Sequence, residues 1–144
     1  PASVRDAVLA RAAPLSAAAR DVLERVSVAP AQLERDLLAA LAGDPAAAIK
    51  ECSDAGLLLD DGSVVKFRHE LARQSIESSL LPTRARALHS EMFHALTARA
   101  ASAARRVHHA ERAGGKGQAK TPFEFAVLLF ADVELIDDPL RHLR

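Results

Sequence analysis

The stretch "FRHELARQSIESSL", residues 67–80, contains the strongest candidate for chemistry, His69. A β-rich run, "GSVVKF", ends there and a helical run begins, so His69 is predicted to lie in the first turn of a helix. The backbone N–H groups of that turn have no partner within the helix, and such a terminus attracts phosphate. His69 could donate a hydrogen bond to a phosphate oxygen. The commoner use of such a residue is as a half-buried helix cap, and the residues alone leave both interpretations open.

Four further histidines and the single cysteine are not spaced like a metal or catalytic site. His89 and His94 are five positions apart, which places them on different sides of a helix. His108 and His109 are adjacent, so their side chains are expected to diverge as well. Cys52 is predicted to be a small core residue rather than a nucleophile. The sequence therefore predicts no metal site. It also predicts no enzyme, because neither a Ser-His-Asp arrangement nor a carboxylate pair stands out.

The stretch "GGKGQAKT", residues 114–121, partly fits the phosphate-binding pattern G-x-x-x-x-G-K-[ST]. Ala119 stands where the second glycine of that pattern lets the backbone approach the phosphates. No apolar strand precedes the stretch, and Pro122 follows it directly. We therefore interpret these residues as a basic linker, and we expect no ATP hydrolysis by this chain.

Helical periodicity dominates the elements that must position His69. Ser3, Ser16 and Asp44 each precede a helical apolar pattern and are predicted N-caps. A third helix is predicted over "AQLERDLLAAL", and Gly43 should end it. Gly56 follows the last turn of the fourth helix, as a C-terminal glycine does.

The period changes at residues 57–67, "LLLDDGSVVKF". Two short apolar runs flank Asp-Asp-Gly-Ser, which predicts a β-hairpin. Helices resume at His69, and Pro82 opens another helix, whose buried stripe is predicted to be Leu88, Met92, Phe93 and Leu96. Three helices, a hairpin and a helix follow one another in the order of a winged helix. We therefore predict a mainly α fold: a winged-helix-like helical domain with one small β-hairpin, followed by further helices.

Composition excludes several function classes. The 19 basic and 19 acidic residues of the 144-residue chain cancel, so no overall field steers it to nucleic acid or to a membrane. The helix expected to read DNA, "DPAAAIKECSDAG", carries one Lys and no Arg, so no direct DNA contact is expected. The longest apolar run, "FAVLLFA", is too short to span a bilayer, and no signal peptide is visible. A cytoplasmic protein is therefore expected, and the missing initiator Met suggests a fragment.

Several stretches resemble one family. They are "PASVRDAVLARAAPLSAAARDVLE", "LLAALAGDPAAAIKECSDAGLLLDDGSVVKFRHELARQSI", "RARALHSEMFHAL" and "RVHHAERAG". Together they are similar to the segment after the ATPase module in large LuxR-family transcriptional regulators, which belong to the signal-transduction ATPases with numerous domains. The similarity covers about residues 1–114. It implies a non-catalytic module that relays nucleotide state from an ATPase core to helical repeats and a DNA-binding domain. ATP or ADP would belong to the parent protein, with no cofactor in this chain alone.

The resemblance also implies a role for two residues. "RHEL" looks like the Met-His-Asp motif of related immune-receptor and apoptosome ATPases, in which the histidine touches the β-phosphate of ADP and holds the closed state. His69 matches that histidine, Glu70 stands where the aspartate does, and Arg68 replaces the methionine. His69 and Glu70 are thereby implied to sense a nucleotide phosphate.

Four regions follow from pattern and resemblance together. Residues 1–14 are the end of an ATPase-linked helical region, and residues 15–81 are a winged-helix domain. Residues 82–114 are connecting helices at the entrance of a repeat array, and residues 115–144 are a linker with a divergent tail. In the tail, "TPFEFAVLLFADVELI" is predicted to be a helix, although its β-branched middle would also suit a strand. A stand-alone DNA-binding winged helix, or a truncated remnant without present function, stay open as alternatives.

Overall fold

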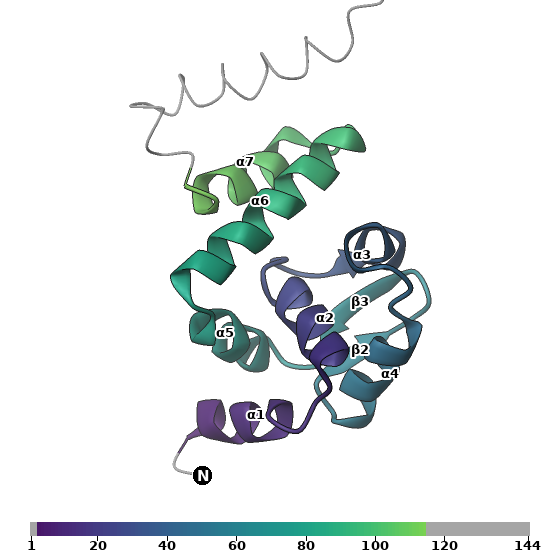
Figure 1. Cartoon of the computed structure of the whole chain (residues 1–144), viewed down its shortest axis with the longest axis vertical. Coiled ribbons are helices and arrows are strands. Elements are labelled where there is room, and N and C mark those ends of the chain that lie inside the picture. The colour runs from purple at the N-terminus through teal and green to yellow at the C-terminus, as the bar shows by residue number, and fades with distance from the viewer. Residues whose placement is uncertain (1–2, 115–144) are drawn as a thin grey trace, which may run out of the picture. The chain divides into compact units, whose positions relative to one another are not determined.

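The computed structural model describes residues 3–114, which form mainly helices with a small antiparallel sheet (Figure 1). Two compact units are present, one covering Pro1–Leu88 and the other beginning at His89. The elements in chain order are α1 (Val4–Ala12), α2 (Ala17–Ser27), β1 (Leu33–Glu34), α3 (Arg35–Ala42), α4 (Ala46–Asp54), β2 (Leu58–Asp60), β3 (Val64–Phe67), α5 (Glu70–Ser79), α6 (Pro82–Ala98) and α7 (Ala103–Arg112). The mainly α fold class is thereby confirmed.

Two serines begin the first two helices, as predicted. The Ser3 hydroxyl accepts the backbone N–H of Asp6 at 3.1 Å, and the Ser16 hydroxyl accepts that of Ala19 at 3.1 Å. Each bond satisfies one of the N–H groups that a helix start leaves without a partner. The Ser16 hydroxyl also donates to a carboxylate oxygen of Glu51 at 2.7 Å, which ties the start of α2 to α4.

The starts of the third and fourth helices differ from the prediction. Leu33 and Glu34 form strand β1, so α3 begins later, at Arg35. Leu33 is fully buried opposite Val65 of β3, and this pairing outweighs the helical pattern of its neighbours. The N-cap of α4 is Pro45 rather than Asp44, although the Asp44 carboxylate still accepts the N–H of Ala46 at 3.1 Å.

The predicted hairpin is confirmed, and it belongs to a three-stranded sheet of order β1-β3-β2. Strand β2 pairs antiparallel with β3, with Leu58 opposite Phe67. The Asp61 carboxylate accepts the N–H groups of Ser63 and Val64 at 2.8 Å each, and Gly62 supplies the positive φ of the turn. From α2 onward the chain forms a helix, a strand, two helices and a hairpin, and the first strand pairs with the last. This is the arrangement of a winged helix.

Helix α2 lies at the centre of the first unit and contacts α3, α4, α5 and β3 (Figure 1). Its buried face carries Ala19, Val22, Leu23 and Val26. Cys52 of α4 is fully buried against it and donates its S–H to the Ala19 carbonyl at 3.2 Å. Burial, helped by the charge of Glu51, raises the pKa of this thiol to about 12, so it stays neutral. The prediction of a core cysteine is confirmed.

The second unit has a small core of its own. Phe93 of α6 and Val107 of α7 pack against buried Ala110. Of the predicted α6 stripe, Phe93 is half-buried and the other three residues are buried: Leu88, Met92 and Leu96. Among residues 3–114, no helix combines the length and the apolar character that crossing a membrane requires. The predicted linker and tail helix lie outside the described residues, as does the partial P-loop pattern beyond Gly114.

Candidate functional site

His69 is the N-cap of α5 and directly follows the wing hairpin. Its backbone is extended, with φ −136° and ψ 134°, and its carbonyl accepts the N–H groups of Ala72 and Arg73 at 3.0 and 3.2 Å. The side chain is exposed and makes no capping hydrogen bond. The prediction of a helix-capping position is confirmed, but the ring is exposed rather than half-buried, and its side chain does not form the cap. The ring stands in solvent beside the first turn of a ten-residue helix.

Glu70 behaves differently from its neighbour, because its carboxylate is already engaged. Arg73 donates to it from Nε at 3.0 Å and from Nη2 at 2.8 Å, and the Gln74 amide donates at 3.2 Å. The hydrogen bonds from Arg73 lower the pKa of Glu70, so the group is anionic at neutral pH. An anionic Glu70 repels a phosphate rather than binding it. The Glu70 carboxylate is thus engaged within α5, whereas the neighbouring His69 ring is exposed.

Arg73 is the residue that sequence reasoning missed in this region. Its Nη1 donates to the Ser27 carbonyl at 2.7 Å and pairs with Glu77, while its other nitrogens hold Glu70. The guanidinium thus joins the first two turns of α5 to the C-terminal end of α2. The Glu70–Arg73–Glu77 spacing was a readable signal for ion pairs along a helix, but the bond to Ser27 was not. This link holds the His69 end of α5 on the core.

A second charged network, also missed from the sequence, joins the first turn of α6 to the middle of α2. Arg84 of α6 donates to Asp21 at 2.6 Å and to Glu24 at 2.9 Å, and Arg25 donates to Asp21 at 2.8 Å. Burial opposes ionisation of Asp21, but the bonds from Arg25 and Arg84 outweigh it and lower the pKa of Asp21. Helix α2 is therefore tied to α5 through Arg73 and to the start of α6 through Arg84.

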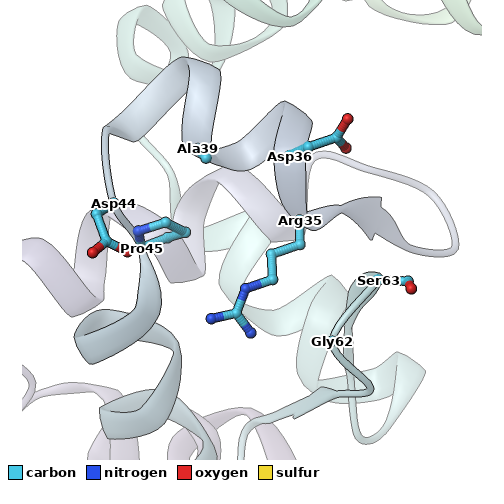
Figure 2. Close-up of a pocket in the computed structure, with 7 residues that line it drawn as sticks. All are labelled: Arg35, Asp36, Ala39, Asp44, Pro45, Gly62 and Ser63. Atoms are coloured by element: carbon cyan, nitrogen blue, oxygen red, sulfur yellow. The ribbon is translucent and has the colours of Figure 1, made fainter.

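A shallow surface hollow lies between the start of α3, the α3–α4 turn and the hairpin tip. The Arg35 side chain extends into it, with Asp36 and Asp44 among the residues around it (Figure 2). Arg35 forms an ion pair with Asp60 of β2. The cation among the described lining residues is thus neutralised by a carboxylate, with two more nearby. The hollow does not have the charge of a phosphate or DNA site.

Helix α4 occupies the place of a winged-helix recognition helix, and its surface lacks a free cation in the described chain. Lys50 is exposed and is held by Asp54 at 2.7 Å. The Glu51 carboxylate accepts both the N–H and the hydroxyl of Ser16, and these bonds lower its pKa. The remaining exposed residues of this helix are Ala46 and Ala47. Apart from the Lys50–Asp54 pair, the exposed residues of α4 are thus small and apolar.

Three histidines come together in the second unit, contrary to the prediction that His108 and His109 diverge. His89 of α6 lies beside both, and one ring nitrogen from each of the three residues falls within 4.8 Å of the others. The Nδ1 atoms of His89 and His109 are 2.9 Å apart. His94 is exposed and outside the group, so the predicted divergence of His89 and His94 is confirmed. The rings meet because α6 and α7 pack together, which no spacing within one helix reveals.

Burial controls the charge of this cluster. His89 is 4% exposed and His109 is 3% exposed. Burial, followed by the positive potential of His108 and Arg112, lowers the pKa of His89 to about 4. Burial also lowers the pKa of His109 to about 3, assisted by His89, His108 and nearby arginines. Both rings are therefore neutral at pH 7, and their Nδ1 atoms share one hydrogen.

Comparisons with protein-family models, with curated proteins and with solved structures found no match. The similarity to LuxR-family regulators noted from the sequence therefore stays a prediction.

Proposed function

We propose that this chain is the winged-helix segment of an ATP-dependent, LuxR-type transcriptional regulator, and that it relays nucleotide state without catalysing a reaction. One observation carries the proposal: the His69 ring is exposed at the N-cap of α5 and is not used for capping. A helix start with N–H groups available and a histidine beside them suits the terminal phosphate of a bound nucleotide. The nucleotide would be ADP held by the parent's ATPase core.

The sensing group is His69 alone, and Glu70 serves another purpose. The carboxylate of Glu70 is paired with Arg73, which reduces its repulsion of an incoming phosphate. The same arginine fixes α5 to the Ser27 carbonyl at the end of α2. Glu70 is therefore a positioning residue that sets the helix start on which His69 stands.

The charged links suggest how a signal leaves the site. A displacement of His69 would move the N-terminus of α5, and the Arg73–Ser27 hydrogen bond couples that end of α5 to α2. Arg84 then joins α2 to the first turn of α6, whose later residues belong to the second unit. The partners of this relay are the ATPase core before the segment and the helical repeats after it, in a cytoplasmic regulator. Direct DNA contact is not part of the proposed function, because Lys50 of α4 is paired with Asp54 and Arg35 beside the hairpin is paired with Asp60.

The test is His69→Ala in the regulator that carries this segment. A hydrogen bond to a charged group contributes about 1.5–3 kcal/mol. Its loss should speed ADP release and raise uninduced transcription by roughly tenfold to a hundredfold. The measurements are the ADP dissociation rate and the output of a reporter gene.

The matched control is His94→Ala, which removes another exposed histidine and should change neither measurement. The isolated 144-residue chain should stay folded with His69→Ala, because that ring buries little surface. If the His69 and His94 variants release ADP at the same rate, His69 is not a phosphate sensor and the proposed function loses its support.

A further inference from the structure

The cluster of His89, His108 and His109 has the composition of a metal site. One histidine comes from α6 and two from α7, and all three ring nitrogens concerned lie within 4.8 Å of one another. Imidazole nitrogen is the ligand that Zn²⁺ and its neighbours Cu²⁺, Ni²⁺ and Co²⁺ accept readily in proteins. We propose that these three histidines bind one divalent transition-metal ion of the Zn²⁺ type, with a fourth position open to water.

The distances are close to what such an ion needs. Zn–N bonds of 2.0–2.1 Å in a tetrahedron place the ligand nitrogens about 3.3 Å apart. The Nδ1 atoms of His89 and His109 are 2.9 Å apart, slightly nearer than that. The widest separation in the cluster, up to 4.8 Å, exceeds the tetrahedral value by about 1.5 Å. Binding therefore requires the rings to move together by rotation about their χ angles.

The surroundings keep two of the three proposed ligands uncharged. His89 and His109 are buried and neutral at pH 7, so their nitrogen lone pairs need not lose a proton to a binding ion. Without metal, the two Nδ1 atoms share a single hydrogen, which satisfies one ring as donor and the other as acceptor. For a metal ion to bind both Nδ1 atoms, the donor ring must change tautomer, releasing its Nδ1 proton to water and taking up a proton at Nε2, so that each Nδ1 presents a lone pair. His108 is half-buried and gives the cluster its side nearest to solvent.

Two arginines near the cluster reduce its affinity for a metal cation. Arg105 and Arg112 contribute to the positive potential that lowers the pKa of His109, and Arg112 Nη1 donates to the His108 carbonyl at 3.1 Å. This potential opposes a dication, so binding should be weaker than in a site lined by carboxylates. The same potential favours an anion, such as hydroxide or chloride, at the fourth position.

A bound ion would have a structural consequence for the second unit. The apolar cluster described there comprises Phe93 and Val107 around Ala110. An ion held by His89 on one helix and by His108 and His109 on the next would cross-link α6 and α7. Since only the folded chain brings the three rings together, binding should stabilise that unit and raise its melting temperature.

The experiment uses the full 144-residue chain without a histidine tag. Zn²⁺ affinity is measured by competition with a coloured chelator, and Co²⁺ is added to look for the intense visible bands of a tetrahedral ion. The proposal expects one ion per chain in both experiments. His108→Gln should weaken binding by about a hundredfold and abolish the tetrahedral Co²⁺ bands. His108 is chosen because it is less buried than its two partners, so its loss should leave α7 folded.

His94→Gln is the matched control on α6, and it should bind both metals as the unchanged chain does. Far-UV circular dichroism of the His108→Gln chain shows whether the helices persist. Three outcomes would overturn the proposal: no saturable binding, equal binding by the two variants, or octahedral Co²⁺ only. In each case the cluster is a hydrogen-bonded histidine pair with a neighbour, and the proposed role of His69 is unaffected.

Discussion

His69 and the pair formed by His89 and His109 place the same imidazole group in opposite surroundings. The His69 ring is exposed at a helix start, whereas the pair is buried between two helices with its Nδ1 atoms 2.9 Å apart. Placement relative to the helices does not distinguish them, since each ring belongs to a residue on or beside a well-formed helix. The difference is exposure to water. Burial makes the charged form of the pair costly, whereas His69 is surrounded by water. The exposed ring suits a ligand that comes and goes, and the buried rings suit either a hydrogen bond or a tightly held ion.

Acidification should separate the two regions most strongly. The folded rings of His89 and His109 titrate near 4 and 3, against an ordinary pKa of 6.5, so below pH 6.5 the unfolded chain binds more protons. Stability of α6 and α7 should be undiminished above about pH 6.5 and should fall by a few kcal/mol toward pH 4. Hydrogen exchange of the α7 amides in the full chain, measured between pH 7 and pH 4.5 after correction for intrinsic rates, gives this quantity.

The controls use conservative replacements that cannot titrate. His69→Gln should leave the pH dependence of the α7 amides unchanged. The double replacement of His89 and His109 by Gln should remove the part of the slope between pH 6.5 and pH 5, where few carboxylates titrate. A slope in that interval that survives the double replacement would show that other groups cause it.

Truncation at neutral pH should give the next largest difference. His109→Ala leaves a cavity and an unpaired Nδ1 on buried His89, which should lower the free energy of unfolding by about 2 kcal/mol. His69→Ala should change it by less than about 0.5 kcal/mol, because an exposed ring without a hydrogen bond contributes little. Urea denaturation followed by far-UV circular dichroism measures both. Equal losses for the two variants would contradict the contrast in burial.

A smaller loss than that of His109→Ala is expected at Arg73, the residue that supports the exposed histidine. Arg73→Met keeps most of the side-chain volume but removes the bonds to Glu70, Glu77 and the Ser27 carbonyl. We expect a loss of about 1 kcal/mol, since part of this network is in solvent. Lys50→Met, which breaks only an exposed pair with Asp54, should have no measurable effect. Amide exchange should also become faster in the first turn of α5 in the Arg73 variant, and unchanged exchange there would mean that Arg73 does not anchor the helix.

Features set by neighbouring residues could be predicted from the sequence. The serine caps of α1 and α2 depend on groups three positions away, and the hairpin turn depends on Asp61 and Gly62 within it. His69 was likewise placed correctly at a helix start, because the change from a strand pattern to a helical one is local. These elements need no knowledge of the rest of the chain.

Features that depend on distant partners could not be predicted. Strand β1 is two residues long and exists because Leu33 pairs with Val65, which lies far along the chain. The Arg73–Ser27 and Arg84–Asp21 links join helices whose relative placement the sequence does not give. The histidine cluster was excluded for the same reason, since its ligand atoms meet only when α7 packs on α6.

Cys52 gives the first unit an internal reporter of its own opening. The thiol is fully buried in α4 and its pKa is raised to about 12, so neither access nor ionisation permits attack on an alkylating reagent while the core is closed. The chain has no Trp or Tyr whose fluorescence or absorbance would report unfolding. With one cysteine in the sequence, every modification takes place at the same site, after the packing around α2 has opened. Because reclosing is fast relative to alkylation, the rate at which iodoacetamide labels the native chain measures the population of that open state.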